Sequence, residues 1–291
     1  WHEQKKGNTV ETKWGDCVLL DMRHLGEKKI NEPLPLVREL ATYYVGHDPV
    51  KDPVPVRPEV QFMMGGIDTN INGETPMPGL YAIGETSCSG LHGANRLGSN
   101  SLTELLVAGK RSAQRAVEYA REAGRAPDDV AVTAQAEAVV KGVRELLLQQ
   151  GDESLAKLRR EMRNSLEEGA GIYREEASTH ATCDTIAGLK QRYGSIEVHD
   201  KSNVFNTDLQ QALELRNLLD IAETVAEASL LRRESRGAHQ RLDYPERDDA
   251  EFLRHSLAFR QAADRPRVEW LDVTITRSQP GVRDYSGGKS S

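Results

Sequence analysis

The segment GLYAIGETSCSGLHGANRLGSNSLTELL, residues 79–106, decides the interpretation of this chain. It starts with a short apolar run at residues 80–83, whose composition predicts a β-strand. Gly84 and Glu85 end that run and place a carboxylate at the end of the strand. A loop rich in Gly, Ser and Asn then leads into a helical pattern. A strand, a polar loop and a helix N-terminus in this order form the kind of crevice in which α/β proteins bind ligands.

The helix is predicted to start from an N-cap at Asn100, with Ser101 and Glu104 in the Ser-x-x-Glu spacing of a capping box. Its apolar stripe begins at Leu102 and continues for about six turns. The free N–H groups and the dipole of the first turn favour anionic or electron-rich ligand groups. Arg96, shortly before the N-cap, adds a fixed cation with a forked arrangement of donors. Together these features predict a substrate that carries a carboxylate.

The rest of the chain predicts a mixed fold with separate strand-containing and helical parts. Helices are expected over residues 33–45, through almost all of 127–193, and from Asn206 to a left-handed C-cap at Gly237. The charged helical stretches are typical of a helix bundle with a solvated outer face. Short strands are expected at residues 17–20, 61–67, 196–198 and 268–275, and a stiff, proline-rich extended segment at 49–58.

Composition excludes several classes of function. The 291 residues carry a net charge of -7 without a long basic block, which argues against nucleic acid as a partner. No apolar run approaches the length of a membrane helix. Cys17, Cys88 and Cys183 form no Cys-x-x-Cys pair, and the histidines are dispersed. We therefore predict a reducing compartment and no bound transition metal.

The chain opens with Trp1 and contains no Gly-x-Gly-x-x-Gly fingerprint after a strand. A self-sufficient dinucleotide-binding protein of this type needs that fingerprint. We therefore expect this sequence to be the C-terminal part of a longer polypeptide.

Residues 79–102, GLYAIGETSCSGLHGANRLGSNSL, closely resemble the flavin-binding core of the flavoprotein subunit of fumarate reductase and succinate dehydrogenase. The resemblance continues in LDMRHLGEKKI (residues 20–30), YYVGHDPVKDPVPVRP (residues 43–58) and RESRGAH (residues 233–239). WLDVTITR, at residues 270–277, is more similar to the tail of the quinone-linked enzymes, fumarate reductase above all, than to that of L-aspartate oxidase.

The resemblance implies a multidomain α+β and α/β fold. It would contain the C-terminal part of an FAD-binding flavoprotein fold, a helical bundle domain and a small β-containing tail. We expect residues 1–55 to end a mobile capping domain and residues 56–122 to complete the FAD-binding domain. Residues 123–240 would form the helical domain, and residues 241–291 a C-terminal extension with a disordered tail.

The resemblance also implies roles for particular residues. Glu85 would hold a polyol part of FAD, and the backbone N–H groups of Ser101 and Leu102 would face the pyrimidine side of the flavin ring. Arg96 would bind a substrate carboxylate and lie beside the cofactor. On local sequence alone, a Glu in this position is commonly a surface or capping residue, and a lone Arg usually makes a surface salt bridge.

Gln61 stands where the resembled family carries a His that helps to bind the substrate carboxylate, three residues before Met-Gly-Gly. Gln can donate a neutral amide hydrogen bond but cannot supply imidazolium charge. We assign Gln61 to substrate and cofactor binding, and its neighbour Phe62 to cofactor binding. His92 is a weaker candidate in the Arg96 loop, and Arg236 and His239 are expected to be supporting residues.

The function implied by the resemblance is the FAD-dependent interconversion of fumarate and succinate by hydride transfer from flavin N5. Covalent attachment of FAD through a His, and a proton-donating Arg, are expected upstream of this chain, so no catalytic residue is assigned within it. The implied partners are an iron–sulfur subunit and membrane anchor subunits. The implied location is peripheral, on the cytoplasmic face of the inner membrane, in the electron transport of anaerobic respiration.

Two alternatives stay open at this point. L-aspartate oxidase shares the scaffold, although the long charged region after Leu257 favours the enzymes that work in complexes. A non-catalytic docking module for an iron–sulfur subunit is favoured by Gln61, but the intact set of Glu85, Arg96 and Ser101 with its neighbour Leu102 speaks against it.

Overall fold

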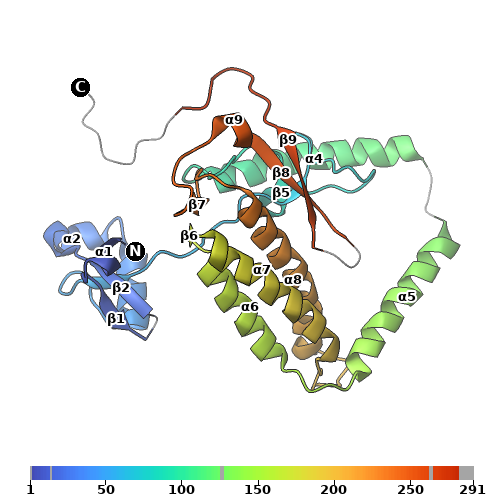
Figure 1. The fold of residues 1–291 in the computed structure, drawn as a ribbon, viewed down its shortest axis with the longest axis horizontal. Helices are drawn as coiled ribbons and strands as arrows, with labels where there is room; N and C mark the ends of the chain where they lie inside the picture. Colours follow the sequence, from blue (N-terminus) through green and yellow to red (C-terminus); the bar gives the residue numbers. More distant parts are fainter. Residues whose placement is uncertain (1, 14, 125–127, 262–264, 282–291) are drawn as a thin grey trace. The chain divides into compact units, whose positions relative to one another are not determined.

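The structure, a computed structural model of the chain, describes residues 2–13, 15–124, 128–261 and 265–281. It divides into two compact units, Trp1–Met63 and Met64–Ser291 (Figure 1). Within these units helices and small sheets are combined, as the sequence predicts. The functional domain boundaries expected near residues 55, 122 and 240 stay predictions.

The first unit combines a small sheet with short helices. Its elements are α1 (His2–Lys5), β1 (Val10–Thr12), β2 (Gly15–Leu20), the 3-10 helix η1 (Arg23–Leu25), α2 (Gly26–Asn31), α3 (Pro35–Leu40), the π-helix η2 (Ala41–Val45) and β3 (Val54–Val56). The three strands form an antiparallel sheet in the order β1-β2-β3. Met22, Ile30, Ala41 and Val54 form the buried core of this unit.

Most elements expected in this unit are present. The predicted strand at residues 17–20 lies within β2, and the predicted helix at 33–45 is formed by α3 together with η2. The proline-rich segment contributes β3, in which Pro55 pairs with Leu19. Proline is tolerated there because β3 is an edge strand and one of its N–H rows faces away from the sheet.

The second unit is mainly helical. Its elements are β4 (Ile67–Asp68), the 3-10 helix η3 (Gly84–Thr86), β5 (Ser87–Cys88), α4 (Asn100–Ala123), α5 (Asp129–Leu148), α6 (Leu155–Ala170), β6 (Tyr173–Arg174), α7 (Glu176–Arg192), the 3-10 helix η4 (Tyr193–Ser195), α8 (Thr207–Leu231), β7 (Gln240–Arg241), α9 (Asp249–Phe252), β8 (Arg254–Phe259) and β9 (Arg267–Asp272). Its described strands pair as β4-β5, β6-β7 and β8-β9.

Helices α6, α7 and α8 pack together and bury the main core of this unit (Figure 1). Leu158, Ile186 and Leu215 are fully buried, one from each helix. Burying side chains of this size contributes about 2 kcal/mol each. The helix bundle expected from the apolar stripes is therefore confirmed for these helices. By contrast, α5 contains no buried residue.

Three predicted strands are wrong. Residues 80–83 are extended but form one isolated bridge, between Tyr81 and Glu74, and residues 61–66 have no regular structure. Of residues 196–198, only Ile196 makes a bridge, with Glu153. An apolar, β-prone run becomes a strand only where a neighbouring chain offers a continuous row of hydrogen-bonding groups.

The end of α8 also differs from the prediction. The helix stops at Leu231, and Gly237, with a φ of 58°, lies in the following turn rather than at the C-cap. The guanidinium of Arg241 donates to the backbone carbonyls of Ser229, Leu230 and Arg232 at 3.1–3.2 Å. A buried arginine from beyond the helix thus satisfies the free carbonyls that a glycine C-cap otherwise covers.

The predicted strand at residues 268–275 is present as the shorter β9, and it pairs in antiparallel fashion with β8, which the sequence reading missed. Trp270 packs edge to face on Phe252 of α9, with ring centroids 5.4 Å apart. Most of the tail that was expected to be disordered, residues 282–291, lies outside the described residues.

Candidate functional site

The loops around Glu85 are held by a close backbone approach. Strands β4 and β5 pair in parallel, with Ile67 opposite Ser87. Gly66, just before β4, has a φ of 133°, and a Cβ on it would lie 2.8 Å from the carbonyl carbon of Thr86. Only glycine allows two backbones to approach in this way. The close approach to Thr86 therefore explains why a glycine is needed at Gly66, the second glycine of the Met-Gly-Gly segment.

Glu85 lies in the short 3-10 helix η3, and its side chain is exposed. The adjacent Gly84 has a φ of 70° and is in contact with the side chain of Leu105, so η3 packs directly on α4. An exposed carboxylate on a turn that is fixed in this way can accept hydrogen bonds from two hydroxyl groups of a ligand.

The N-terminus of α4 is not closed by a capping box, and that prediction is wrong. The N-cap is Ser99, which has a φ of 65° and makes no side-chain hydrogen bond to the first turn. The side chains of Asp128, Ser154 and Asn206 do cap α5, α6 and α8. The first-turn N–H groups of α4 are thus left without a side-chain cap, as a helix N-terminus that binds an anionic or electron-rich ligand requires.

Glu104, the expected partner in that capping box, has another environment. It is only 8% exposed, and its Oε2 has no hydrogen-bond partner among the described residues. Its side chain therefore points into the protein and does not return to the N-cap. Leu102, in contrast, is 69% exposed on the first turn.

Arg96 lies in the loop between β5 and α4 and is half-buried. Its Nη1 donates to the carbonyl of Leu97 at 3.4 Å. The structure thus places Glu85 on η3, Ser101 and Leu102 on α4, which packs on η3, and Arg96 in the loop that leads into α4. Gln61, which is exposed, and Phe62, which is half-buried, belong to the first compact unit.

The RESRGAH segment forms a dense ionic cluster. Glu234 has no exposed surface and accepts from Arg232 at 2.7 Å and from Arg236 at 2.8 Å. Nδ1 of His239 accepts a hydrogen bond from Arg174 at 2.7 Å, and its Nε2 lies 3.0 Å from the carbonyl of Arg232. Burial lowers the pKa of His239 to about 4, and the surrounding arginines act in the same direction.

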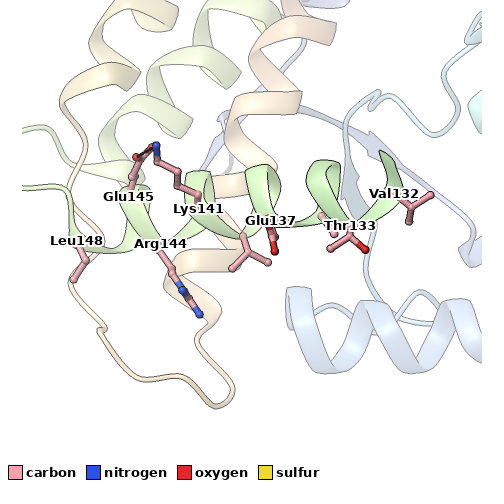
Figure 2. A pocket seen from close by; sticks show the side chains of 9 residues that line it. Val132, Thr133, Glu137, Lys141, Arg144, Glu145 and Leu148 are labelled. Atoms are coloured by element: carbon pink, nitrogen blue, oxygen red, sulfur yellow. Dashed lines mark ion pairs between the residues drawn. The ribbon is translucent and has the colours of Figure 1, made fainter. Parts of the chain in front are cut away.

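A groove of about 690 Å³ runs along α5 (Figure 2). All of its lining residues lie on this helix, between Val132 and Leu148, and none is a predicted site residue. Lys141 and Glu145 pair across its surface at 3.8 Å. Because every lining residue comes from one helix, the groove encloses no ligand, and we assign it no chemistry.

Within the described residues, no group of three or more His, Cys, Asp and Glu side chains is arranged to hold a metal ion. Cys17, Cys88 and Cys183 are free thiols. The predicted absence of a transition metal stays a prediction.

Two family models match different parts of the chain. Residues 1–102 match the family described as FAD binding domain, and residues 159–285 match the family described as fumarate reductase flavoprotein C-term. The first match contains all the predicted site residues, and the second contains the RESRGAH cluster. Together they define a flavoprotein with a fumarate reductase type of C-terminal region.

The relatives are more specific. The chain is 51% identical to the fumarate reductase flavoprotein subunit of Escherichia coli over 99% of its own length and 48% of the relative. It is 36% identical to the succinate dehydrogenase flavoprotein subunit of Rickettsia bellii over 92% of its length and 46% of the relative. A solved structure of E. coli quinol fumarate reductase superposes with a TM-score of 0.93 at 51% identity, covering 97% of this chain and 48% of that one.

The chain therefore belongs to the fumarate reductase and succinate dehydrogenase flavoprotein family. The predicted fold class is confirmed by the same comparisons. The chain spans about half the length of the curated relatives it matches.

Proposed function

We propose that this chain supplies part of an FAD and dicarboxylate site that interconverts fumarate and succinate. The observation that carries the proposal is the N-terminus of α4, which has no side-chain cap and lies next to η3 with the exposed Glu85 and after the loop with Arg96. The relatives' names and the match of this region to an FAD binding domain support it.

The residues present fit an FAD molecule. An exposed carboxylate at Glu85 suits sugar or ribityl hydroxyls, and the uncapped N–H groups of Ser101 and Leu102 suit the electron-rich edge of a flavin ring. When bound, FAD would supply the hydride, and a separate proton completes the reduction of fumarate to succinate. Fixed N–H dipoles at the helix terminus stabilise the negative charge that develops beside them without having to reorient.

Arg96 is the proposed substrate-binding residue. A guanidinium can hold one carboxylate through two parallel hydrogen bonds, and this orients a small dicarboxylate. Gln61 is proposed as a second, neutral donor to the substrate, and Phe62 as part of the cofactor wall. We place the proton-donating Arg and the flavin-attaching His in a portion of the flavoprotein outside these residues.

The proposed partners are an iron–sulfur subunit and membrane anchor subunits, with the flavoprotein peripheral on the cytoplasmic face of the inner membrane. The similarity to a quinol fumarate reductase supports this assembly. No helix in the described ranges is long and apolar enough to cross a bilayer.

The test is steady-state turnover of the flavoprotein expressed from its complete coding sequence, with fumarate, succinate and L-aspartate as substrates. We expect activity with the first two. Activity with L-aspartate alone would replace this proposal with the aspartate oxidase alternative. No turnover with any of them, from a preparation with full flavin content, would favour the docking module.

Arg96→Lys in that protein tests the substrate site. Lysine keeps the charge but loses the fork, so kcat/KM for fumarate is expected to fall by about 100-fold while the flavin content stays unchanged. Arg121→Lys is the matched control, because Arg121 is exposed in the last turn of α4, the helix that follows the Arg96 loop. Equal kinetics for the two variants would show that Arg96 does not bind substrate.

A further inference from the structure

The turn at residues 236–239 contacts the loop that carries Arg96. The N–H of Ala238 donates to the carbonyl of Ala94 at 3.0 Å. Ala94 is two residues before Arg96 in the sequence. Ala238 comes more than a hundred residues after both. A segment of the C-terminal family match is thus hydrogen-bonded to the candidate substrate loop of the FAD-binding match.

Gly237 allows this contact for two reasons. Its φ of 58° is in the left-handed region, which side chains other than glycine rarely adopt. A Cβ on Gly237 would also lie 2.6 Å from the carbonyl carbon of Ala94 and 2.7 Å from its Cβ. Any side chain at this position must therefore shift the turn against the backbone of the Arg96 loop.

The turn is rigid on its own side. Arg236 and His239 exchange two backbone hydrogen bonds, at 2.8 and 3.0 Å, and Gln240 Nε2 donates to the carbonyl of Gly237 at 2.9 Å. Arg236 also makes a two-pronged contact with the buried carboxylate of Glu234, at 2.8 and 2.9 Å. A second Arg, Arg232, donates to the same carboxylate.

Among the described residues, the loop also has short-range backbone bonds, such as Gly93 N to Gly90 O at 3.2 Å. Its beginning meets the C-terminal region a second time. A Cβ on Gly90 would be in ordinary contact, at 3.6 Å, with the ring of His255 on β8. The C-terminal region therefore lies close to the loop at Gly90 and is hydrogen-bonded to it at Ala94.

We propose that Gly237 and Ala238 are positioning residues that set the place of the Arg96 guanidinium, and that the Glu234 cluster keeps their turn rigid. The inference rests on the proposed function, because it assigns to Arg96 the substrate carboxylate. The C-terminal region then contributes to dicarboxylate affinity without touching the substrate.

The experiment uses the complete flavoprotein and malonate, a dicarboxylate with no CH–CH bond to oxidise, whose binding is followed by the flavin absorbance. Gly237→Ala is expected to raise the Kd for malonate about 10-fold to 100-fold, because small displacements of a binding group have effects of this size. The flavin content should not change. Gly124→Ala is the matched control: Gly124 has a φ of 53° and only ordinary contacts, so its Kd should equal that of the wild type.

A double-mutant cycle with Arg96→Lys separates positioning from general damage. In the Arg96→Lys background, Gly237→Ala is expected to add less than threefold to the Kd, since the fork it positions is already lost. Fully additive effects would overturn the proposal. If Arg96→Lys weakens malonate binding but Gly237→Ala behaves like Gly124→Ala, only the positioning is wrong. If Arg96→Lys itself has no effect, the proposed function fails.

If Gly237→Ala does not fold, Gln240→Ala tests whether the turn positions Arg96. It removes one hydrogen bond to the turn and leaves the ion pairs in place. The loss of one such bond is expected to raise the malonate Kd about threefold. An unchanged Kd in folded Gln240→Ala, together with an unfolded Gly237→Ala, would overturn the proposal.

Discussion

At the scale of single residues, Gln61 marks where the chain departs from the resembled family. An amide can donate a hydrogen bond but has no charge to add to that of Arg96. In the complete flavoprotein, Gln61→His is expected to lower the KM for fumarate about 10-fold below pH 6.5, where the imidazole is charged. Steady-state kinetics across pH 5.5–8 measure this, and an unchanged KM would remove residue 61 from the substrate site.

His239 is held in one neutral tautomer by its two partners. Arg174 can only donate, so Nδ1 accepts and Nε2 carries the proton that is shared with the carbonyl of Arg232. Because burial lowers the pKa from 6.5 to about 4, the unfolded chain binds more protons in this range than the folded chain. Stability from His239 is therefore complete above pH 6.5 and is lost as the pH falls toward 4.

His239→Gln tests that pH dependence. Glutamine can accept from Arg174 and donate to Arg232 at every pH, so the variant should not lose the stability that the wild type loses on acidification, about 2 kcal/mol between pH 6.5 and 5. Thermal melting of both proteins at several pH values measures the difference. His199→Gln, at an exposed site, should follow the wild type. A wild-type slope in His239→Gln would exclude His239 as the cause.

At the scale of elements, the helices differ sharply in how much they contribute to stability. Leu215 of α8 is fully buried in the bundle core, while Leu148 of α5 is 72% exposed. Leu215→Ala is expected to lower the free energy of unfolding by 2–5 kcal/mol, roughly the range for core truncations, and Leu148→Ala by about 0.5 kcal/mol or less. Denaturant titration followed by circular dichroism compares them. Similar losses would mean that α5 is packed as closely as α8.

The predictions about single helices and strands that were wrong also have a physical reason. Apolar periodicity placed α4 and the start of α8 within a few residues, because a helix satisfies its own backbone hydrogen bonds. It predicted α5, α6 and α7 as one helical stretch without separating them. The strands at residues 80–83 and 196–198 failed because a strand depends on a partner that the local pattern does not contain. The end of α8 failed because its carbonyls are satisfied by Arg241, a residue from beyond the helix.

At the scale of the whole molecule, the chain matches its relatives along almost all of its own length but only about half of theirs. Glu85, Arg96 and the α4 terminus are therefore proposed to form one part of a larger site. The isolated 291-residue chain is expected to hold no stoichiometric FAD and to reduce no fumarate. Flavin absorbance of the purified chain and an anaerobic turnover assay check this, and stoichiometric flavin with turnover would mean that these residues suffice.

The amino-acid sequence alone was enough to recognise the family, the helical bundle and the candidate residues Glu85, Arg96, Ser101 and Leu102, because motifs and helical periodicity are local properties of the chain. It also indicated that residues 79–106 form a polar loop before a helix that favours a carboxylate. The roles of these residues stay proposals.

The folded chain was needed to see that Ser99 leaves the α4 terminus without a side-chain cap, that Gly66 lies against Thr86, and that Gly237 lies against Ala94. These features depend on contacts between segments far apart in the chain or on a single backbone angle. Neither leaves a periodic signal in the residues themselves. The same physical reason explains why RESRGAH looked like a helix end in the sequence and is a support for the Arg96 loop in the folded chain.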